Sequence, residues 1–175
     1  MAAWRLEAGS STGPRSGLWT SVGTTVASAA PVPTPCCLLQ TRRGSVPVLT
    51  PDLLQACVPA GARCATLGPH LLEDDLRAVL SRGGARGGVH GTCGSGMADY
   101  LLLFSTFDAC MFRPGIPTGD TYLGVNTGPS GNKQVTVPQF LASAAASGSQ
   151  LVECIADVVA PGTVNTKRLK KSLAR

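Results

Sequence analysis

Aromatic and acidic residues are both scarce in this chain of 175 residues. Phenylalanine, tyrosine and tryptophan make up 5% of the sequence, whereas there are 21 glycines and 13 prolines. A hydrophobic core must therefore be built mainly from leucine, valine and alanine, and much of the chain is expected to be irregular. The 10 acidic residues stand against 15 basic ones and leave a net charge of +5. This excess is compatible with a polyanionic partner but does not by itself select one.

Long apolar runs and clustered metal-ligand motifs are also missing. No apolar stretch approaches the roughly 18 residues of a membrane-spanning helix, so we expect no integral membrane segment. The 7 cysteines are odd in number, form no CxC or CxxC pair and follow no convincing secretory signal. We expect them to be reduced and to act as small buried hydrophobes in a cytoplasmic protein. A metal-ligand role for the lone pair of His90 and Cys93 is the alternative.

We expect residues 1–35 to form a loose N-terminal extension. Serine, threonine, glycine and alanine dominate this segment without a sustained hydrophobic period, and three prolines close it. Arg5 and Arg15, with many hydroxyl groups and a single acid, also resemble a mitochondrial targeting segment. That interpretation stays open as the alternative.

Residues 37–57 carry the densest local signals in the chain. Two apolar runs, residues 37–39 and 46–49, flank a basic turn, which favours a hairpin. Thr50 and Pro51 then suit the start of a helix over residues 51–57, with the Thr50 hydroxyl as its cap.

Hydrophobic spacing predicts further elements along the rest of the chain. The run over residues 100–104 is apolar throughout, as expected for a strand that is covered on both faces. The glycine- and asparagine-rich stretch over residues 126–132 predicts a hairpin turn. Further strands are expected over residues 63–67, 122–125, 134–137 and 151–155, and further helices over 70–80, 138–148 and 166–175.

Residues 82–96, RGGARGGVHGTCGSG, are the compositional outlier of the chain. We expect this glycine-rich segment to interrupt the domain around it. An RNA-binding arginine–glycine tract is the alternative, although no tyrosine or phenylalanine separates the arginines. A phosphate-binding loop is excluded because the GxxxxGK[ST] pattern is absent.

Three blocks of sequence resemble the queuine tRNA-ribosyltransferase family, and specifically its accessory, non-catalytic subunit. They occur in the family's order and at plausible spacing, and together they cover about residues 35–175. The blocks are CLLQTRRGSVPVLTPDLL over residues 37–54, MADYLLLFSTFD over 97–108 with QVTVPQFL over 134–141, and LVECIAD over 151–157 with TKRLKKSL over 166–173.

The resemblance implies an α/β fold of the (β/α)8 TIM-barrel type. Such barrels need about 250 residues, so residues 36–175 are expected to form only the first few βα units of an incomplete barrel. The chain would then be a truncated form of the accessory subunit. In such a barrel Asp108 would follow the strand over residues 100–104 at the end where chemistry occurs. We expect it to tie a loop instead, and we expect His70 to be exposed or to cap a helix rather than to bind a ligand.

The same resemblance implies that this chain is not itself an enzyme. The catalytic branch carries an Asp-Ser-Gly-Gly-Phe-Gln segment, and here residues 100–108 take its place. The family's carboxylate nucleophile and the CxCxxC and histidine ligands of its zinc site have no counterpart in this chain. Its partner would be the catalytic subunit, in a heterodimer that exchanges guanine for queuine at the wobble position of tRNA anticodons. The alternatives are a competent transglycosylase and a truncated fragment without function.

The helix expected over residues 166–175 offers the candidate contacts to tRNA. Leu169 and Leu173 share one face of this helix, and the remaining faces are basic. The candidate contacts are Lys167, Arg168, Lys170 and Lys171. The alternative is a solvated helix whose cations only favour its negative C-terminal end. By resemblance, the complex would be cytoplasmic and peripherally associated with the mitochondrial outer membrane.

Overall fold

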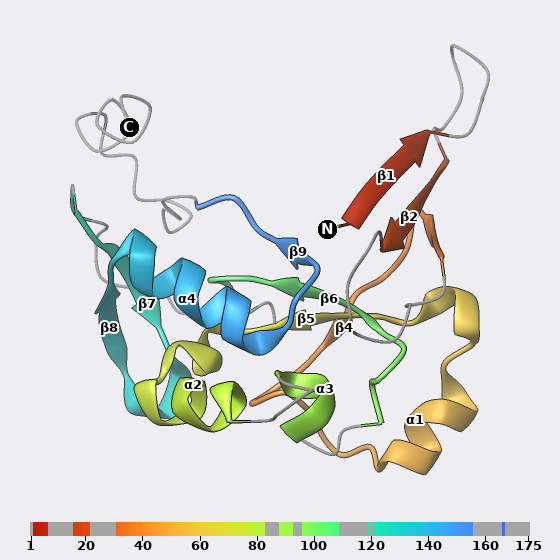
Figure 1. Cartoon of the computed structure of the whole chain (residues 1–175), viewed down its shortest axis with the longest axis horizontal. Coiled ribbons are helices and arrows are strands. Elements are labelled where there is room, and N and C mark those ends of the chain that lie inside the picture. Colours follow the sequence, from red (N-terminus) through yellow and green to blue (C-terminus); the bar gives the residue numbers. More distant parts are fainter. Residues whose placement is uncertain are drawn as a thin grey trace.

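The protein is described by a computed structural model that combines a parallel sheet with helices and antiparallel hairpins (Figure 1). The structure describes residues 2–6, 16–21, 31–82, 88–92, 96–108, 119, 121–155 and 166. Within these ranges there are three sheets, of four, three and two strands. The predicted α/β class is therefore confirmed at the level of a mixed α/β fold.

The four-stranded parallel sheet is the centre of the molecule. Its order is β4-β5-β6-β9, so neighbours in the sheet follow one another along the chain. A doubly wound sheet would reverse its order at a switch point, and this sheet does not. The strands are β4 (Leu39–Gln40), β5 (Cys64–Leu67), β6 (Leu101–Phe104) and β9 (Leu151–Val152). The strands expected near residues 63–67, 100–104 and 151–155 are thus present, the last one shorter than predicted.

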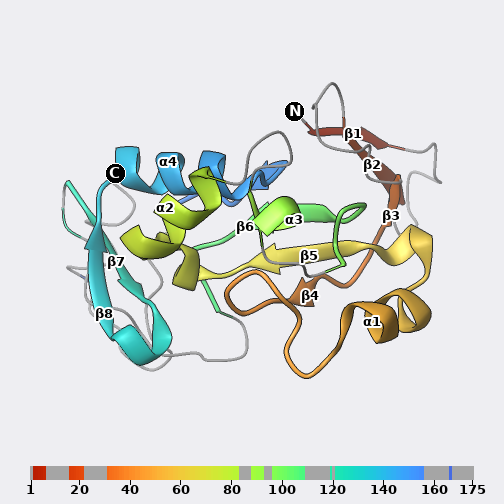
Figure 2. The same cartoon turned by 60° about the horizontal axis from the view of Figure 1, so that its bottom comes forward.

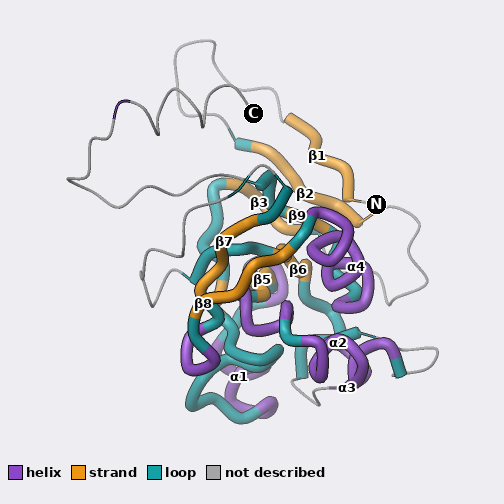
Figure 3. The backbone as a smooth tube through the Cα atoms, turned by 90° about the vertical axis from the view of Figure 1, so that its left-hand side faces the viewer, coloured by secondary structure: helices purple, strands orange, loops and turns teal. Residues whose placement is uncertain are grey.

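Helices occupy the connections between the parallel strands. The helix predicted over residues 51–57 is confirmed as α1 (Pro51–Cys57), but the Thr50 side chain makes no capping hydrogen bond. The α-helical part of the stretch predicted over residues 70–80 is α2, preceded by a 3-10 turn. Figures 2 and 3 show α2, α3 and α4 grouped together and α1 standing apart from them. These three helices are α2 (Asp74–Ser81), α3 (Val89–Thr92) and α4 (Val137–Ser147), and the 3-10 turns are Ala60–Ala62, Pro69–Leu72 and Gly128–Ser130.

Local sequence explains why α4 is the longest described helix. The Thr136 hydroxyl accepts a hydrogen bond from the Gln139 backbone N–H, and the Gln139 side chain accepts one from the Thr136 backbone N–H. This reciprocal capping box fixes the first turn. Gly148 ends the helix in the left-handed conformation, with φ of 73°. The helix predicted from Pro138 to Gly148 is confirmed within one residue at each end.

A β-hairpin precedes α4, as the sequence predicted. Strands β7 (Leu123–Asn126) and β8 (Asn132–Val135) pair in antiparallel register. The Asn126 side chain accepts a hydrogen bond from the Gly128 backbone N–H at 2.9 Å, which closes the turn between them.

The main core lies between the parallel sheet, the hairpin and the helices. Phe104 of β6 and Phe140 of α4 are both almost completely buried, and their rings are tilted by 58° with centroids 5.3 Å apart. Val89 of α3 belongs to the same cluster and is fully buried. The glycine-rich segment, which the sequence predicted to interrupt the domain, therefore contributes Val89 to the core.

The backbone conformation at position 88 explains why this position of the glycine-rich segment is a glycine. Its φ is +77°, and a Cβ atom there would lie 2.4 Å from the Ser147 carbonyl oxygen. A side chain would thus separate α3 from the C-terminal end of α4. The glycine-rich segment also includes residues 83–87 and 93–95, which lie outside the described residues.

The N-terminal segment differs from the loose extension expected over residues 1–35. Its described parts form an antiparallel sheet in the order β1-β2-β3. Val32 of this sheet is fully buried against Cys64 and Leu101, the first residues of β5 and β6, and Trp19 packs on the same cluster. Tertiary contact with the amino ends of the parallel strands, rather than local hydrophobic period, thus holds the described part of this segment. The strands are β1 (Ala2–Leu6), β2 (Gly17–Ser21) and β3 (Val32–Thr34).

The hairpin predicted over residues 37–49 is reduced to a tight turn. Arg42 and Ser45 form one antiparallel bridge around Arg43 and Gly44, whose φ values of 51° and 86° suit a type I′ turn. The second predicted strand is absent because Val48 is left-handed, with φ of 58°, and its side chain is fully exposed. The first strand pairs instead with β5, in parallel.

Candidate functional site

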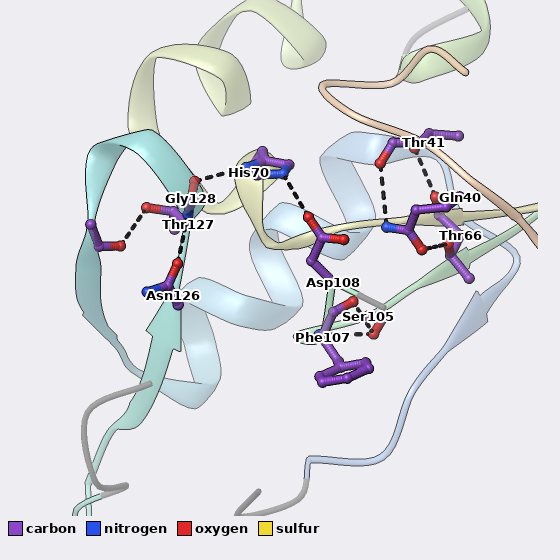
Figure 4. A network of polar contacts seen from close by, with 11 residues as sticks. Gln40, Thr41, Thr66, His70, Ser105, Phe107, Asp108, Asn126, Thr127 and Gly128 are labelled. Carbon is purple, nitrogen blue, oxygen red and sulfur yellow. Dashed lines mark hydrogen bonds and ion pairs between the residues drawn. The ribbon is translucent and has the colours of Figure 1, made fainter. Parts of the chain in front are cut away.

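Polar side chains gather at the carboxyl ends of β4, β5 and β6 (Figure 4). In α/β proteins built from parallel strands, ligands and catalytic groups lie at this edge of the sheet. The residues concerned are Gln40, Thr41, Thr66, His70, Ser105, Asp108 and, from the hairpin turn, Thr127 and Gly128. We therefore treat this network as the candidate functional site.

His70 is the centre of the network. It lies in the 3-10 turn that directly follows β5 and is only 4% exposed. Its Nδ1 is 2.7 Å from the Thr127 carbonyl oxygen, and its Nε2 is 3.3 Å from Oδ2 of Asp108. Because a carbonyl oxygen only accepts hydrogen bonds, Nδ1 carries a proton and donates it to Thr127. The partner of Nε2 is the Asp108 carboxyl group.

The expectation that His70 is exposed or caps a helix is wrong. The Gly68–Pro69 sequence turns the chain at the end of a buried strand and brings the next residue beneath the β7–β8 hairpin. This contact joins residues 57 positions apart. No local pattern in the sequence indicates such a contact, and none indicated Thr127 and Gly128 as the partners of His70.

Gly128 is where the hairpin backbone approaches the imidazole ring. Its φ is +78°, and a Cβ atom there would lie 2.8 Å from Cε1 of His70. Glycine therefore satisfies both the left-handed turn and the close contact. The hairpin signal in the sequence predicted the turn but not the ring against which it packs.

Asp108 and Ser105 order the chain that leaves β6. Asp108 is only 6% exposed, and it links this loop to His70. The Ser105 hydroxyl accepts a hydrogen bond from the Phe107 backbone N–H at 2.9 Å and contacts the Glu153 carboxylate after β9. Ser105 thus ties this loop locally, and Asp108 connects the loop to the turn after β5.

Gln40 and Thr66 extend the network to β4. The Thr66 hydroxyl donates to Oε1 of Gln40 at 2.7 Å, and the Thr41 hydroxyl donates to the Thr66 carbonyl oxygen at 2.7 Å. Gly68 lies between Gln40 and His70, since a Cβ atom there would be 3.5 Å from Nε2 of Gln40 and 3.7 Å from the His70 ring. The carboxyl ends of three neighbouring strands are therefore joined by side chains.

A cleft of about 370 Å³ opens beside this network. It is lined by Glu73, Asp74, Asp75, Thr127, Ser130, Asn132 and Lys133. Lys133 lies 3.2 Å from the Asp74 carboxylate and also donates to the Leu72 carbonyl oxygen at 3.0 Å. Arg77 lies 3.0 Å from the same carboxylate. Cations of the protein thus neutralise Asp74, and the cleft is less acidic than its three carboxylates suggest.

The His70–Asp108 pair consists of the residue types of a general base and its orienting acid. However, no ring nitrogen of His70 is open to a substrate. A general base needs a nitrogen within hydrogen-bonding reach of substrate. Here one ring nitrogen faces Thr127 and the other faces Asp108. The ring is therefore engaged on both sides by the protein, and the arrangement holds the hairpin, the β5 turn and the β6 loop together.

The sequence also predicted site residues at His90, at Cys93 and in the C-terminal basic helix. His90 lies in α3. Cys93 and the candidate tRNA contacts Lys167, Arg168, Lys170 and Lys171 lie outside the described residues and stay predictions. Among the residues that the structure describes, no group of three or more histidine, cysteine or acidic side chains is placed to hold a metal ion.

Comparison with known proteins adds no identification. No protein-family model matches the chain, and no curated protein sequence matches it. In the described parts of the chain, no helix has the length and apolar character needed to cross a membrane. The class that the structure defines is a mixed α/β protein with a parallel sheet in sequential order.

Proposed function

We propose that this chain is the N-terminal part of the accessory, non-catalytic subunit of a queuine tRNA-ribosyltransferase complex. Its partner would be the catalytic subunit, which exchanges guanine for queuine at the wobble position of tRNA anticodons. Contact with tRNA would occur in the assembled complex, with Lys167, Arg168, Lys170 and Lys171 as candidate contacts. The three blocks of sequence described above supply the family, and the structure supplies two supporting arguments.

The first argument comes from the strand order. Four parallel strands in sequential order, joined by connections that contain helices, are what the first βα units of a (β/α)8 barrel require. Among the described residues, β4 and β9 lie at the two edges of this sheet. In a closed barrel each would gain a second neighbour. We therefore propose that residues 36–175 correspond to part of such a barrel.

The observation that carries the proposal is the state of the side chains after β6. The resemblance places the catalytic branch's acid–base segment here, and this chain instead has Ser105 and Asp108. Both are held by other parts of the protein, Ser105 near Glu153 and Asp108 near His70. Side chains engaged in this way hold loops in place, which suits an accessory subunit more than an enzyme.

The test is to purify the chain alone and together with the catalytic subunit of the same organism. We expect co-elution as a heterodimer, measured by light scattering, and incorporation of radiolabelled guanine into tRNA only when the catalytic subunit is present. Incorporation by this chain alone would instead indicate a competent transglycosylase. Failure to associate, with a flat thermal melt and rapid proteolysis, would indicate a fragment without function.

The proposed location follows from the same resemblance and from the use of cysteine. We propose a cytoplasmic protein whose complex associates peripherally with the mitochondrial outer membrane. The zinc site of the full-length family belongs to sequence that this chain does not contain. No step of the proposed role of this chain depends on that metal.

A further inference from the structure

Two cysteines lie side by side where the N-terminal sheet meets the parallel sheet. The sulfur atoms of Cys36 and Cys64 are 3.8 Å apart, although the residues are 28 positions apart in sequence. Cys64 is the first residue of β5 and is fully buried, whereas Cys36 is partly exposed. Both belong to the apolar cluster around Val32 and Leu101. The described cysteines are all free thiols, namely Cys36, Cys37, Cys57, Cys64 and Cys154.

We propose that Cys36 and Cys64 form a reversible disulfide bond when the protein meets a disulfide oxidant such as oxidised glutathione. A disulfide requires the sulfur atoms to approach to about 2.05 Å. At 3.8 Å the two sulfur atoms are already in near contact, and they must close the remaining distance for the bond to form. The bond would fasten the segment after β3 to the start of β5, and so couple the N-terminal sheet covalently to the parallel sheet. This inference does not depend on the proposed function.

The proposed bond forms in two steps, and the difference in burial between Cys36 and Cys64 sets their order. Of these two cysteines, Cys36 is the one whose thiol an oxidant in solution can reach. Its thiolate attacks one sulfur of oxidised glutathione, forms a mixed disulfide and expels one glutathione thiolate, which takes up a proton. The Cys64 sulfur then attacks the Cys36 sulfur, loses its proton to solvent and expels the second glutathione. Two protein thiols are thereby oxidised, and one oxidised glutathione is reduced to two glutathione thiols.

The environment of Cys64 explains why it acts second. Burial, together with the neighbouring Cys36, raises the pKa of the Cys64 thiol to about 12. Its S–H group also points toward the Cys37 carbonyl oxygen at 3.3 Å. Because the thiolate is the nucleophile, Cys64 is a poor first attacker at neutral pH. It becomes effective once a mixed disulfide stands next to it.

Cys37 is the natural competitor for this pairing. It is adjacent to Cys36 and exposed, and its backbone oxygen lies 3.3 Å from the Cys64 sulfur. Cys57 and Cys154 are exposed as well. Among the described cysteines, Cys36 is the one whose sulfur lies 3.8 Å from the Cys64 sulfur.

Tryptic peptide mapping of the full chain after treatment with oxidised glutathione tests the proposal. Cleavage after arginine places Cys36 and Cys37 in residues 16–42, Cys57 in 44–63 and Cys64 in 64–77. We expect a disulfide-linked pair of the peptides 16–42 and 64–77, which dithiothreitol separates. A Cys64 that stays free while the exposed cysteines carry glutathione would overturn the proposal.

Two matched variants distinguish the adjacent cysteines. The change Cys36→Ser should abolish the linked peptide pair, whereas Cys37→Ser should leave its yield within about twofold of the unaltered chain. Both variants keep Cys64, so the buried position is undisturbed in each. A linked pair that persists in Cys36→Ser and disappears in Cys37→Ser would assign the bond to Cys37 and refute our inference.

Discussion

At the scale of single residues, the candidate site is held by side chains whose partners are distant in sequence. His70 contacts Thr127 and Asp108, and the glycine at position 128 allows the hairpin backbone to reach the ring. A buried histidine with partners on both nitrogens is satisfied and therefore compatible with stability. The same engagement removes it from the chemistry that an exposed histidine could perform.

The close contact between Gly128 and His70 gives a residue-scale prediction. The change Gly128→Ala should lower the free energy of unfolding by about 2 to 3 kcal/mol, because a left-handed alanine is strained and its Cβ also displaces the ring. The matched control is Gly128→Ala made in a His70→Ala background, because among the described residues His70 supplies the only atoms that the added Cβ would meet within 4 Å. There the change should cost only about 1 kcal/mol, the strain of a left-handed alanine.

Urea denaturation with and without Gly128→Ala in each background measures these costs from the midpoint and slope. Equal losses of stability in the two backgrounds would show that backbone strain alone accounts for them. The proposed packing of the hairpin turn against His70 would then be unsupported.

At the scale of elements, capping decides which helix ends are well defined. Thr136 and Gln139 form the capping box of α4, and Gly148 ends that helix. Thr50 occupies the same position before α1, but its side chain makes no capping hydrogen bond. Identical residue types at two helix starts thus have different energetic roles.

The two threonines provide a matched pair of substitutions. We expect Thr136→Ala to destabilise the protein by about 1 kcal/mol, because it leaves a helix N–H without its partner. Thr50→Ala should change stability by less than about 0.5 kcal/mol. Thermal denaturation followed by circular dichroism would measure both, and a larger loss for Thr50→Ala would contradict the assignment of the cap.

At the scale of the whole molecule, the parallel sheet is covered differently at its two ends. The N-terminal sheet packs at the amino ends of β5 and β6 through Val32, and the β7–β8 hairpin lies at the carboxyl ends through Thr127. Residues 1–35 were expected to form a loose extension. Their described part instead covers apolar surface of the sheet.

This arrangement predicts that the N-terminal sheet contributes to global stability. Val32→Ala should lower the free energy of unfolding by roughly 1 to 3 kcal/mol, because it removes buried methyl groups and leaves a cavity. Val79→Ala is the control, since Val79 is 46% exposed on α2 and alanine is the better helix former. Equal effects of the two substitutions in urea denaturation would indicate that residues 1–35 form no part of the cooperative fold.

The sequence by itself determined the elements whose signals are local. Pro51 at the start of α1, the capping box of α4 and the asparagine–glycine turn before β8 each act within a few residues. The apolar run of β6 likewise identified a buried strand. Such signals depend on backbone geometry and hydrogen bonding near each residue, so they can be read without knowledge of the path of the chain.

Only the tertiary structure decided which distant residues meet. The pairing of His70 with Asp108 and Thr127, and the approach of Cys36 to Cys64, join positions 28 to 57 residues apart. The ordering of residues 32–34 beside β5 is of the same kind. These contacts arise because parallel strands in sequential order bring their ends together, and burial then favours side chains that satisfy one another there. Neither composition nor periodicity carries that information, because both are properties of a segment and not of its neighbours in space.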